Sequence, residues 1–148
     1  MHLEKPELKQ IIEDPNIPGL QRLVKLFFTP SEASQAAGAA FVIRITQRDQ
    51  DREPISGPKV AGAQLTAFHT WEHGDGERFE KLRQITQPCL VVNGVLDKMI
   101  PVRNSYMLSE HLPKAMLLTY PDAGHGSLFQ FHASFVRQAA LFLDAEML

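Results

Sequence analysis

Two polar side chains in the second half of the sequence each follow a short apolar run that ends at a glycine. Asp97 lies in "CLVVNGVLDKMIP", and His125 lies in "YPDAGHGSLFQ". A carboxylate can accept the Nδ1 proton of an imidazole, which fixes the tautomer in which Nε2 acts as a base. Taken singly, such an Asp is usually a turn former and such a His is usually solvated. The two together form a candidate acid–base pair, provided that the fold brings their loops side by side.

The elements around the pair predict such a meeting. "PCLVVNG" and "AMLLTY" are compact apolar runs without polar alternation, which is typical of strands that are covered on both faces. We predict a helix over Pro101–Leu112 and a long amphipathic helix over Ser127–Glu146, which together give a β-α-β-α unit with parallel strands. Reactive groups gather at the carboxyl ends of parallel strands. The fold class predicted is therefore α/β, with both candidate residues at one edge of a small parallel sheet.

The first part of the chain has helical patterns and no convincing strand. It gives the chain two expected segments, a helical one over residues 1–76 and the β-α-β-α unit over residues 77–148. A third helix is expected to begin with Thr29 as its N-cap and Pro30 in its first position. The other predicted helices are Pro6–Asp14, Gly19–Phe28 and Lys59–His73, and Glu77–Arg83 is expected to be a short charged turn or helix.

Several further side chains receive structural interpretations. Cys89 opens the first strand and is interpreted as a small buried hydrophobe. Ser127 is expected to cap the last helix, and His132 to be a surface or packing residue within it. Four phenylalanines are expected either between the helices or lining a pocket, and the sequence leaves these two alternatives open: Phe27, Phe28, Phe41 and Phe68.

The stretch from Gln84 to Asp144 resembles the C-terminal third of an α/β-hydrolase of the esterase, lactonase and haloperoxidase-like group. In that family the acid stands in a G-x-x-D-x-x-x-P setting, which Gly94, Asp97 and Pro101 match, and the last strand is followed by G-H, which Gly124 and His125 match. The helical first part, roughly residues 4–75, looks like the family's cap. The resemblance implies a serine hydrolase for a carboxylic ester or similar small substrate, in which Asp97 orients His125 as the base.

The family's nucleophile motif, G-x-S-x-G, does not occur in these 148 residues. We therefore expect the chain to be the cap and C-terminal part of such an enzyme, either truncated or encoded alone, and to have little or no hydrolase activity by itself. None of its serines has glycine both two residues before and two residues after it: Ser31, Ser34, Ser56, Ser105, Ser109, Ser127 and Ser134.

A second reading is a non-catalytic interaction or oligomerisation module. In the family the penultimate strand is an interior one, so here its free edge, around Leu90–Asn93, would be exposed and apolar. Such an edge favours pairing with another chain, in a homodimer or in a complex with the missing N-terminal half.

A third reading comes from "HTWEH", which fits the H-x-x-E-H zinc motif of some metallopeptidases. His69 and His73 would share a helical face, with Glu72 as general base. Catalytic zinc usually takes three protein ligands, and the sequence marks no third one. We interpret these residues mainly as polar neighbours of a buried Trp71, and we expect no metal or other cofactor.

The composition sets the remaining expectations. The formal net charge is −2, and the Lys and Arg residues are scattered, so nucleic acid and anionic membranes are not expected partners. No apolar run is long enough to span a membrane, and the N-terminus does not resemble a signal peptide. The single cysteine fits a reducing compartment, and we expect the protein to be cytoplasmic.

Overall fold

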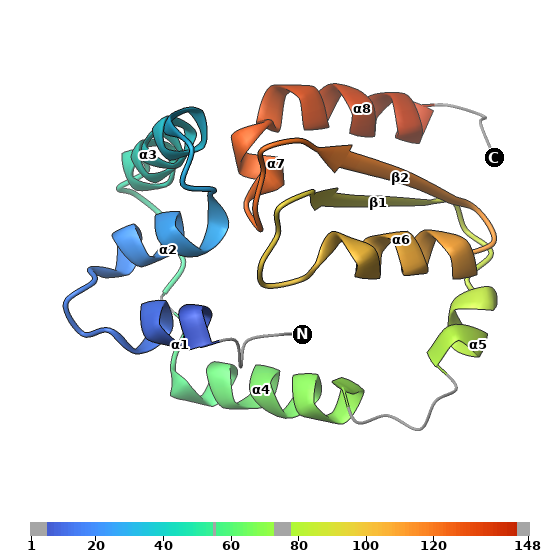
Figure 1. The fold of residues 1–148 in the computed structure, drawn as a ribbon, viewed down its shortest axis with the longest axis horizontal. Helices are drawn as coiled ribbons and strands as arrows, with labels where there is room; N and C mark the ends of the chain where they lie inside the picture. The colour runs from blue at the N-terminus through green and yellow to red at the C-terminus, as the bar shows by residue number, and fades with distance from the viewer. Residues whose placement is uncertain (1–5, 55, 73–77, 145–148) are drawn as a thin grey trace.

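The computed structural model describes residues 6–54, 56–72 and 78–144 of the chain (Figure 1). Four helices come first: α1 (Pro6–Glu13), α2 (Gly19–Phe27), α3 (Glu32–Gln47) and α4 (Pro58–Glu72). The short helix α5 (Arg78–Arg83) leads into the second half. There the order is β1 (Cys89–Gly94), α6 (Val102–His111), β2 (Ala115–Tyr120), α7 (Ser127–Gln130) and α8 (His132–Asp144). The fold is therefore α/β, as predicted, and no strand occurs before β1 among the described residues.

The two strands are parallel neighbours, which confirms the predicted β-α-β arrangement. Their register runs from Cys89 opposite Ala115 to Gly94 opposite Tyr120. Helix α6 packs against both strands, and α8 lies on the far side of the sheet from α6 (Figure 1). Because the strands point the same way, the loops that follow them leave the sheet at the same edge.

Helices α2 and α3 lie beside that edge of the sheet, at the carboxyl ends of β1 and β2 (Figure 1). Helix α1 packs on α2, and α3 packs on both α2 and α7. Helix α4 then runs back past α1 in the direction of α5 (Figure 1). The N-terminal helices therefore meet the strand-exit loops, although up to about a hundred residues separate the two in sequence.

The start of α3 differs from the prediction. Ser31, and not Thr29, is its N-cap, because the Ser31 side chain accepts a hydrogen bond from the backbone N–H of Ser34. The hydroxyl of Thr29 instead donates a hydrogen bond to Asp122 Oδ1, 2.7 Å away. Pro30 consequently stands before the helix and not in its first position.

The predicted long C-terminal helix is wrong in its continuity and in its cap. The chain forms α7 and α8 with Phe131 between them, at φ −107° and ψ 34°. The Phe131 ring stacks on Tyr120, at the end of β2, with centroids 4.9 Å apart, and this packing accompanies the break. Gly126 takes the N-cap position of α7, so Ser127 is its first residue and is buried.

An aromatic cluster fills the contact between the N-terminal helices and α7. Phe28 and Phe41 are buried, and Phe41 stacks on Phe129 with centroids 4.6 Å apart. Phe27 also lies against Phe129, at 6.3 Å. Phe27, Phe28 and Phe41 therefore lie between the helices, which is one of the two alternatives expected for them, whereas Phe68 is 41% exposed on α4.

The structure also tests the interpretations of Cys89 as a buried hydrophobe and of His132 as a surface or packing residue. Cys89 begins β1 as predicted, but it is only half-buried, with Sγ 3.4 Å from the carbonyl oxygen of Gln87. His132, the first residue of α8, is an exposed surface residue.

Gly94 ends β1 at a point where the two strand-exit loops almost touch. A Cβ atom at this position would lie 2.3 Å from the carbonyl oxygens of both Ala123 and Gly124. Both neighbours are backbone atoms, so they could yield only by moving the loop that carries His125. A glycine is therefore required where the backbones approach so closely.

We expect Gly94→Ala to lower the free energy of unfolding by about 1–3 kcal/mol, because the methyl group must displace the 123–124 backbone. Gly62→Ala is the matched control, since nothing lies within 4 Å of its Cβ position in the middle of α4. That control should stabilise the chain by up to about 1 kcal/mol, because Gly disfavours helix interiors. Urea unfolding measures both, and an equal response of the two variants would contradict the steric account.

Candidate functional site

The carboxylate of Asp97 and the imidazole of His125 are in direct contact at the carboxyl ends of β1 and β2. Asp97 Oδ2 lies 2.9 Å from His125 Nδ1. Since a carboxylate can only accept hydrogen bonds, Nδ1 carries the proton and donates it, and Nε2 of the neutral ring is left as the acceptor. The juxtaposition predicted from the two strand exits is therefore confirmed.

Asp97 is fixed by the backbone that follows it. Its Oδ1 accepts hydrogen bonds from the N–H groups of Met99 (2.8 Å) and Ile100 (2.9 Å), and its side chain is only 2% exposed. The loop is tied down further by Leu96, whose N–H donates to the carbonyl of Ala123. Asp97 is thus both the turn former expected of such a residue and the partner of His125, with one oxygen assigned to each role.

His125 is held by contacts from the opposite end of the chain. The Phe27 ring meets the imidazole edge to face, with centroids 5.2 Å apart, and the Phe27 carbonyl accepts the N–H of Gly126 at 2.8 Å. The His125 side chain remains 29% exposed. Its Nε2 makes no hydrogen bond within the described residues. The ring is therefore oriented at Nδ1 and accessible at Nε2.

No serine donates a hydrogen bond to His125 within the described residues. Ser31 donates to Asp122 in the loop before α7, Ser34 donates to Gln130 of α7, and Ser105 accepts from Asn93. Ser127, two residues from the imidazole, is 2% exposed at the start of α7. Cys89 lies at the opposite end of β1 from the pair.

Asp122 is a residue of this site that the sequence analysis missed. Its Oδ1 accepts from Thr29 Oγ1 (2.7 Å), and its Oδ2 accepts from Ser31 Oγ (2.6 Å). The two hydroxyls, that of Ser31 foremost, stabilise the ionised form and lower the pKa of Asp122 below its usual value of 3.8. The sequence around Asp122, "PDAG", is typical of a turn, and no local pattern indicates that its carboxylate binds Thr29 and Ser31, more than 90 residues away.

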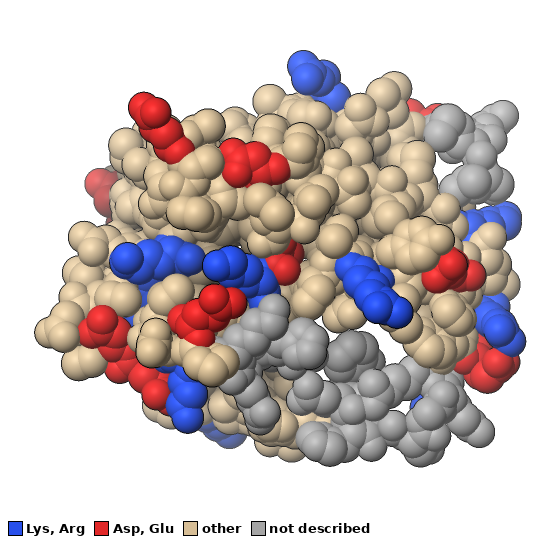
Figure 2. All heavy atoms as spheres, viewed as in Figure 1, with Lys and Arg blue, Asp and Glu red and all other residues tan. Residues whose placement is uncertain are grey.

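A groove of about 830 Å³ lies beside the pair, between α1, α2 and the loop that follows β1. Asp97 and Gly124 reach it, and its wall includes buried Leu8 and the exposed Leu96. The charged side chains along it are Glu7, Lys25, Lys98 and Arg103. In the view of Figure 2, the Lys and Arg side chains of the described residues are intermixed with Asp and Glu side chains.

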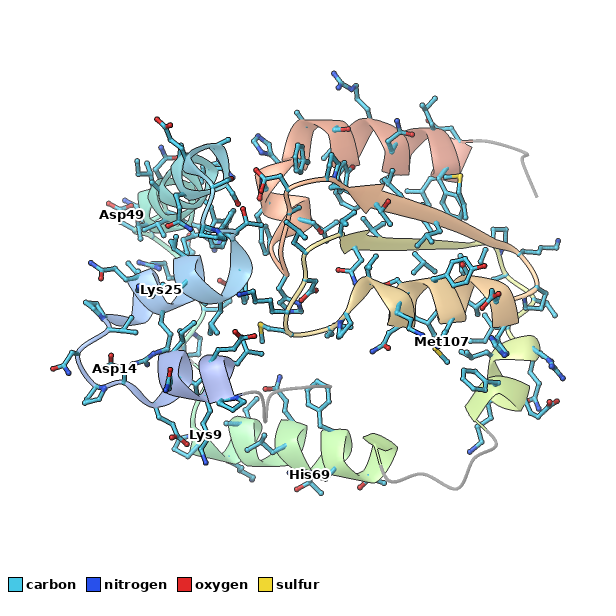
Figure 3. The ribbon with its side chains drawn as sticks, in the orientation of Figure 1. Lys9, Asp14, Lys25, Asp49, His69 and Met107 are labelled. Carbon is cyan, nitrogen blue, oxygen red and sulfur yellow. The ribbon has the colours of Figure 1, made fainter. Side chains whose placement is uncertain are left out.

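The "HTWEH" residues fall largely outside the described part of the chain, which includes neither His73 nor the side chains of Trp71 and Glu72. His69 lies on α4, apart from the loops that follow β1 and β2 (Figure 3). Among the described residues, no three His, Cys, Asp or Glu side chains gather as a metal site would require.

Two parallel strands with helices on both sides, and an Asp–His pair at the strand exits, define an α/β-hydrolase-like half-fold. Residues 56–146 match the α/β-hydrolase family described as TAP-like protein. The chain therefore belongs to that family.

Solved structures support the same fold. An α/β hydrolase fold protein from Chitinophaga pinensis is 34% identical, with a TM-score of 0.85 over 97% of this chain and 50% of its own. A 2-hydroxy-6-oxo-6-phenylhexa-2,4-dienoate hydrolase from Rhodococcus sp. strain RHA1 is 19% identical, with a TM-score of 0.59 over 94% of this chain and 48% of its own.

A curated relative is a pimeloyl-[acyl-carrier protein] methyl ester esterase from Nitrosomonas europaea. It is 34% identical over 56 residues, which are 38% of this chain and 22% of that protein. The chain thus spans about half the length of the solved relatives and about a fifth of the curated esterase. In the described ranges, no helix is both long and apolar enough to cross a bilayer.

We expect Asp97→Asn to abolish the single tautomer of His125, because an amide can present either its oxygen or its NH₂ group to Nδ1. Nitrogen-15 NMR of the imidazole should show protonated Nδ1 in the native chain and a tautomer mixture in the variant. Asp144→Asn, on the exposed end of α8, is the control. An unchanged spectrum in Asp97→Asn would contradict the assigned donor.

The lowered pKa of Asp122 predicts a pH-dependent contribution to stability. Because the folded pKa is below the unfolded one, the contribution is fully present above the unfolded value of about 3.8 and is lost as the pH falls through the folded value. Asp122→Asn should therefore be less stable than the native chain at pH 6, and the difference should narrow below about pH 4. Thermal unfolding across this range tests it, and a pH-independent difference would contradict it.

Proposed function

We propose that this chain supplies the acid and the base of a serine-type hydrolase that acts on a carboxylic ester or a similar small substrate. Asp97 orients the ring of His125, and His125 Nε2 is the general base. The observation that carries the proposal is the 2.9 Å contact between Asp97 and Nδ1, which leaves Nε2 without a partner among the described residues. Membership of the α/β-hydrolase family and the likeness to a methyl ester esterase support it.

The chemistry follows from that geometry. When a serine hydroxyl attacks the ester carbonyl carbon, its proton passes to His125 Nε2, and the resulting imidazolium is stabilised by the Asp97 carboxylate. His125 then donates this proton to the departing alkoxide oxygen, which leaves as the alcohol. In the second half-reaction a water molecule loses its proton to Nε2 and attacks the acyl-enzyme, which releases the carboxylic acid and restores the serine.

The nucleophile, in this proposal, comes from outside the 148 residues. No serine among the described residues donates a hydrogen bond to His125, and the sequence has no G-x-S-x-G motif. The chain by itself is therefore expected to hydrolyse esters little or not at all, and the substrate pocket is completed by the part that carries the nucleophile.

We also propose that the helical segment, residues 1–76, acts as the cap over the substrate. Its helices α1 and α2 line the groove beside Asp97, and Phe27 lies against His125. The apolar part of the groove wall would accept the acyl or alcohol portion of an ester. The protein is proposed to work in the cytoplasm.

The second candidate function is an interaction module that uses the free edge of β1. The described residues form only a two-stranded sheet, so β1 pairs with β2 alone. Leu90, Val91 and Val92 are only half-buried there, whereas Asn93 is buried and its side-chain amide donates to Ser105 and to the carbonyl of Ile100. We propose that this edge pairs with the complementary half of an α/β-hydrolase fold, and a homodimer is the other outcome.

Two measurements on the chain separate the candidates. Turnover of a short activated ester that is abolished by His125→Ala would favour an enzyme that is active by itself. Absence of turnover is expected from both candidates, so stable self-association of the chain is the result that would favour the interaction module. A clean monomer in sedimentation velocity at high protein concentration would contradict the homodimer.

The catalytic roles are tested best in a complete fold. In the Chitinophaga pinensis relative, the half that this chain matches is replaced by these 148 residues, and hydrolysis of p-nitrophenyl esters is measured. His125→Ala in this chimera should lower kcat by at least about 1,000-fold, because no group is left to take the serine proton. Asp97→Asn should also lower kcat, through loss of the correct tautomer.

His132→Ala is the matched control, since His132 is an exposed imidazole close to His125 in the sequence but is not part of the Asp–His pair. It should leave kcat unchanged. A chimera that keeps most of its activity after His125→Ala would refute the proposed role of the base.

A further inference from the structure

The last residue of α2, Phe27, and the α2–α3 segment that follows it, residues 28–31, are attached to the loop of His125. The carbonyl of Phe27 accepts the N–H of Gly126, and the Phe27 ring packs against the imidazole. Two and four residues further on, the hydroxyls of Thr29 and Ser31 both donate to the carboxylate of Asp122. Residues on both sides of His125 are therefore fastened to one short stretch of the N-terminal helices.

The carboxylate of Asp122 is the centre of this fastening. The backbone carbonyl of Asp122 accepts a hydrogen bond from Gln130 Nε2 at 2.8 Å, and Gln130 Oε1 accepts one from Ser34 Oγ, also at 2.8 Å. Ser34 is fully buried and its hydroxyl also accepts the N–H of Thr29. The network thus closes on itself, from the loop before His125, through α7 and α3, back to the α2–α3 segment.

The backbone of Asp122 shows why the side-chain contacts are needed. Asp122 has φ 46°, in the left-handed region that residues other than glycine rarely adopt. Such a conformation persists only where surrounding contacts hold it. The left-handed residue stands three positions before His125, so a change there redirects the chain that carries the imidazole.

We propose that Asp122 is a positioning residue: by binding the hydroxyls of Thr29 and Ser31, it holds the 122–126 loop so that the His125 ring lies between Phe27 and Asp97. This role rests on the proposed function of His125 as a base. It also makes the α2–α3 segment a fixed wall of the site, so that any opening of the helical segment takes place elsewhere in it. Asp122 touches no reacting atom and acts only through His125.

The consequence is a coupling between two hydrogen bonds on opposite sides of one loop. If the Asp122 carboxylate is removed, the left-handed turn loses its support and His125 Nδ1 is no longer held on Asp97. A residue with a merely structural role would change the unfolding transition without changing the state of the imidazole in the folded chain.

The test uses the intact 148-residue chain and the His125 Nδ1–H signal in proton and nitrogen-15 NMR. In Asp122→Ala, exchange of this proton with water should speed up by at least tenfold and the single tautomer should be lost. Asp122→Asn should rescue part of the effect, because its amide oxygen can still accept from one hydroxyl. Asp144→Ala, an exposed carboxylate on α8, is the control and should change neither quantity.

Thr29→Val provides a second variant that keeps the side-chain volume and removes one donor, for use where Asp122→Ala does not fold. It should accelerate the same exchange, and adding it to Asp122→Asn should produce less than the sum of the two effects, because both act on one contact. Unchanged Nδ1–H exchange in folded Asp122→Ala, or in Thr29→Val, would overturn the proposal.

In the active chimera, Asp122→Ala should lower kcat by a larger factor than it changes KM, since the base is misplaced while the groove wall from α1 and the loop after β1 makes no bond to Asp122. If His125→Ala has no effect on the chimera, the proposed function fails. If His125→Ala inactivates it and Asp122→Ala leaves kcat and Nδ1–H exchange unchanged, only the positioning role fails.

Discussion

The close approach of the loops that follow β1 and β2 is the constraint on which the candidate site depends. The loops meet so closely at Gly94 that no side chain fits between it and the carbonyls of Ala123 and Gly124. This contact is what allows Leu96 to donate to Ala123 and brings Asp97 Oδ2 to His125 Nδ1. Two backbone segments that are held this tightly give the imidazole a fixed partner at little further cost in conformational entropy.

The loop that carries His125 is also held by the N-terminal helices, and these contacts affect the imidazole differently from the contact with Asp97. Asp97 fixes the protonation pattern of His125, because a carboxylate can only accept. Phe27 and the Asp122 contacts fix where the ring lies, through packing and through hydrogen bonds to Thr29 and Ser31. A segment that looks in sequence like a separate helical cap thus contacts the imidazole of His125 and the loop that carries it.

The sequence was sufficient to predict what depends on local pattern and on strand direction. The apolar runs around Val91 and Leu117 marked the strands, and parallel strands imply that residues just beyond them, Asp97 and His125, meet. The sequence was insufficient to predict a helix boundary or a cap that depends on a side chain distant in the sequence. Thr29 is a good N-cap by type, but it is recruited by Asp122, and the last helix breaks at Phe131, whose ring stacks on Tyr120. Phe68 is apolar, yet it is 41% exposed on α4.

The apolar surface that the described residues leave exposed bears on where the nucleophile belongs. Helix α8 presents Val136, Leu141 and Leu143, which are 62%, 63% and 79% exposed, while Val95 and Leu96 are about half exposed beside Asp97. Fully burying one such side chain is worth about 1.5–3 kcal/mol, so contiguous exposure is a cost that a protein partner or a further segment would remove. Of these residues, Val95 and Leu96 line the groove that Asp97 reaches. A partner that covered them would lie along this groove, which is where the proposed function places the half of the fold that carries the nucleophile.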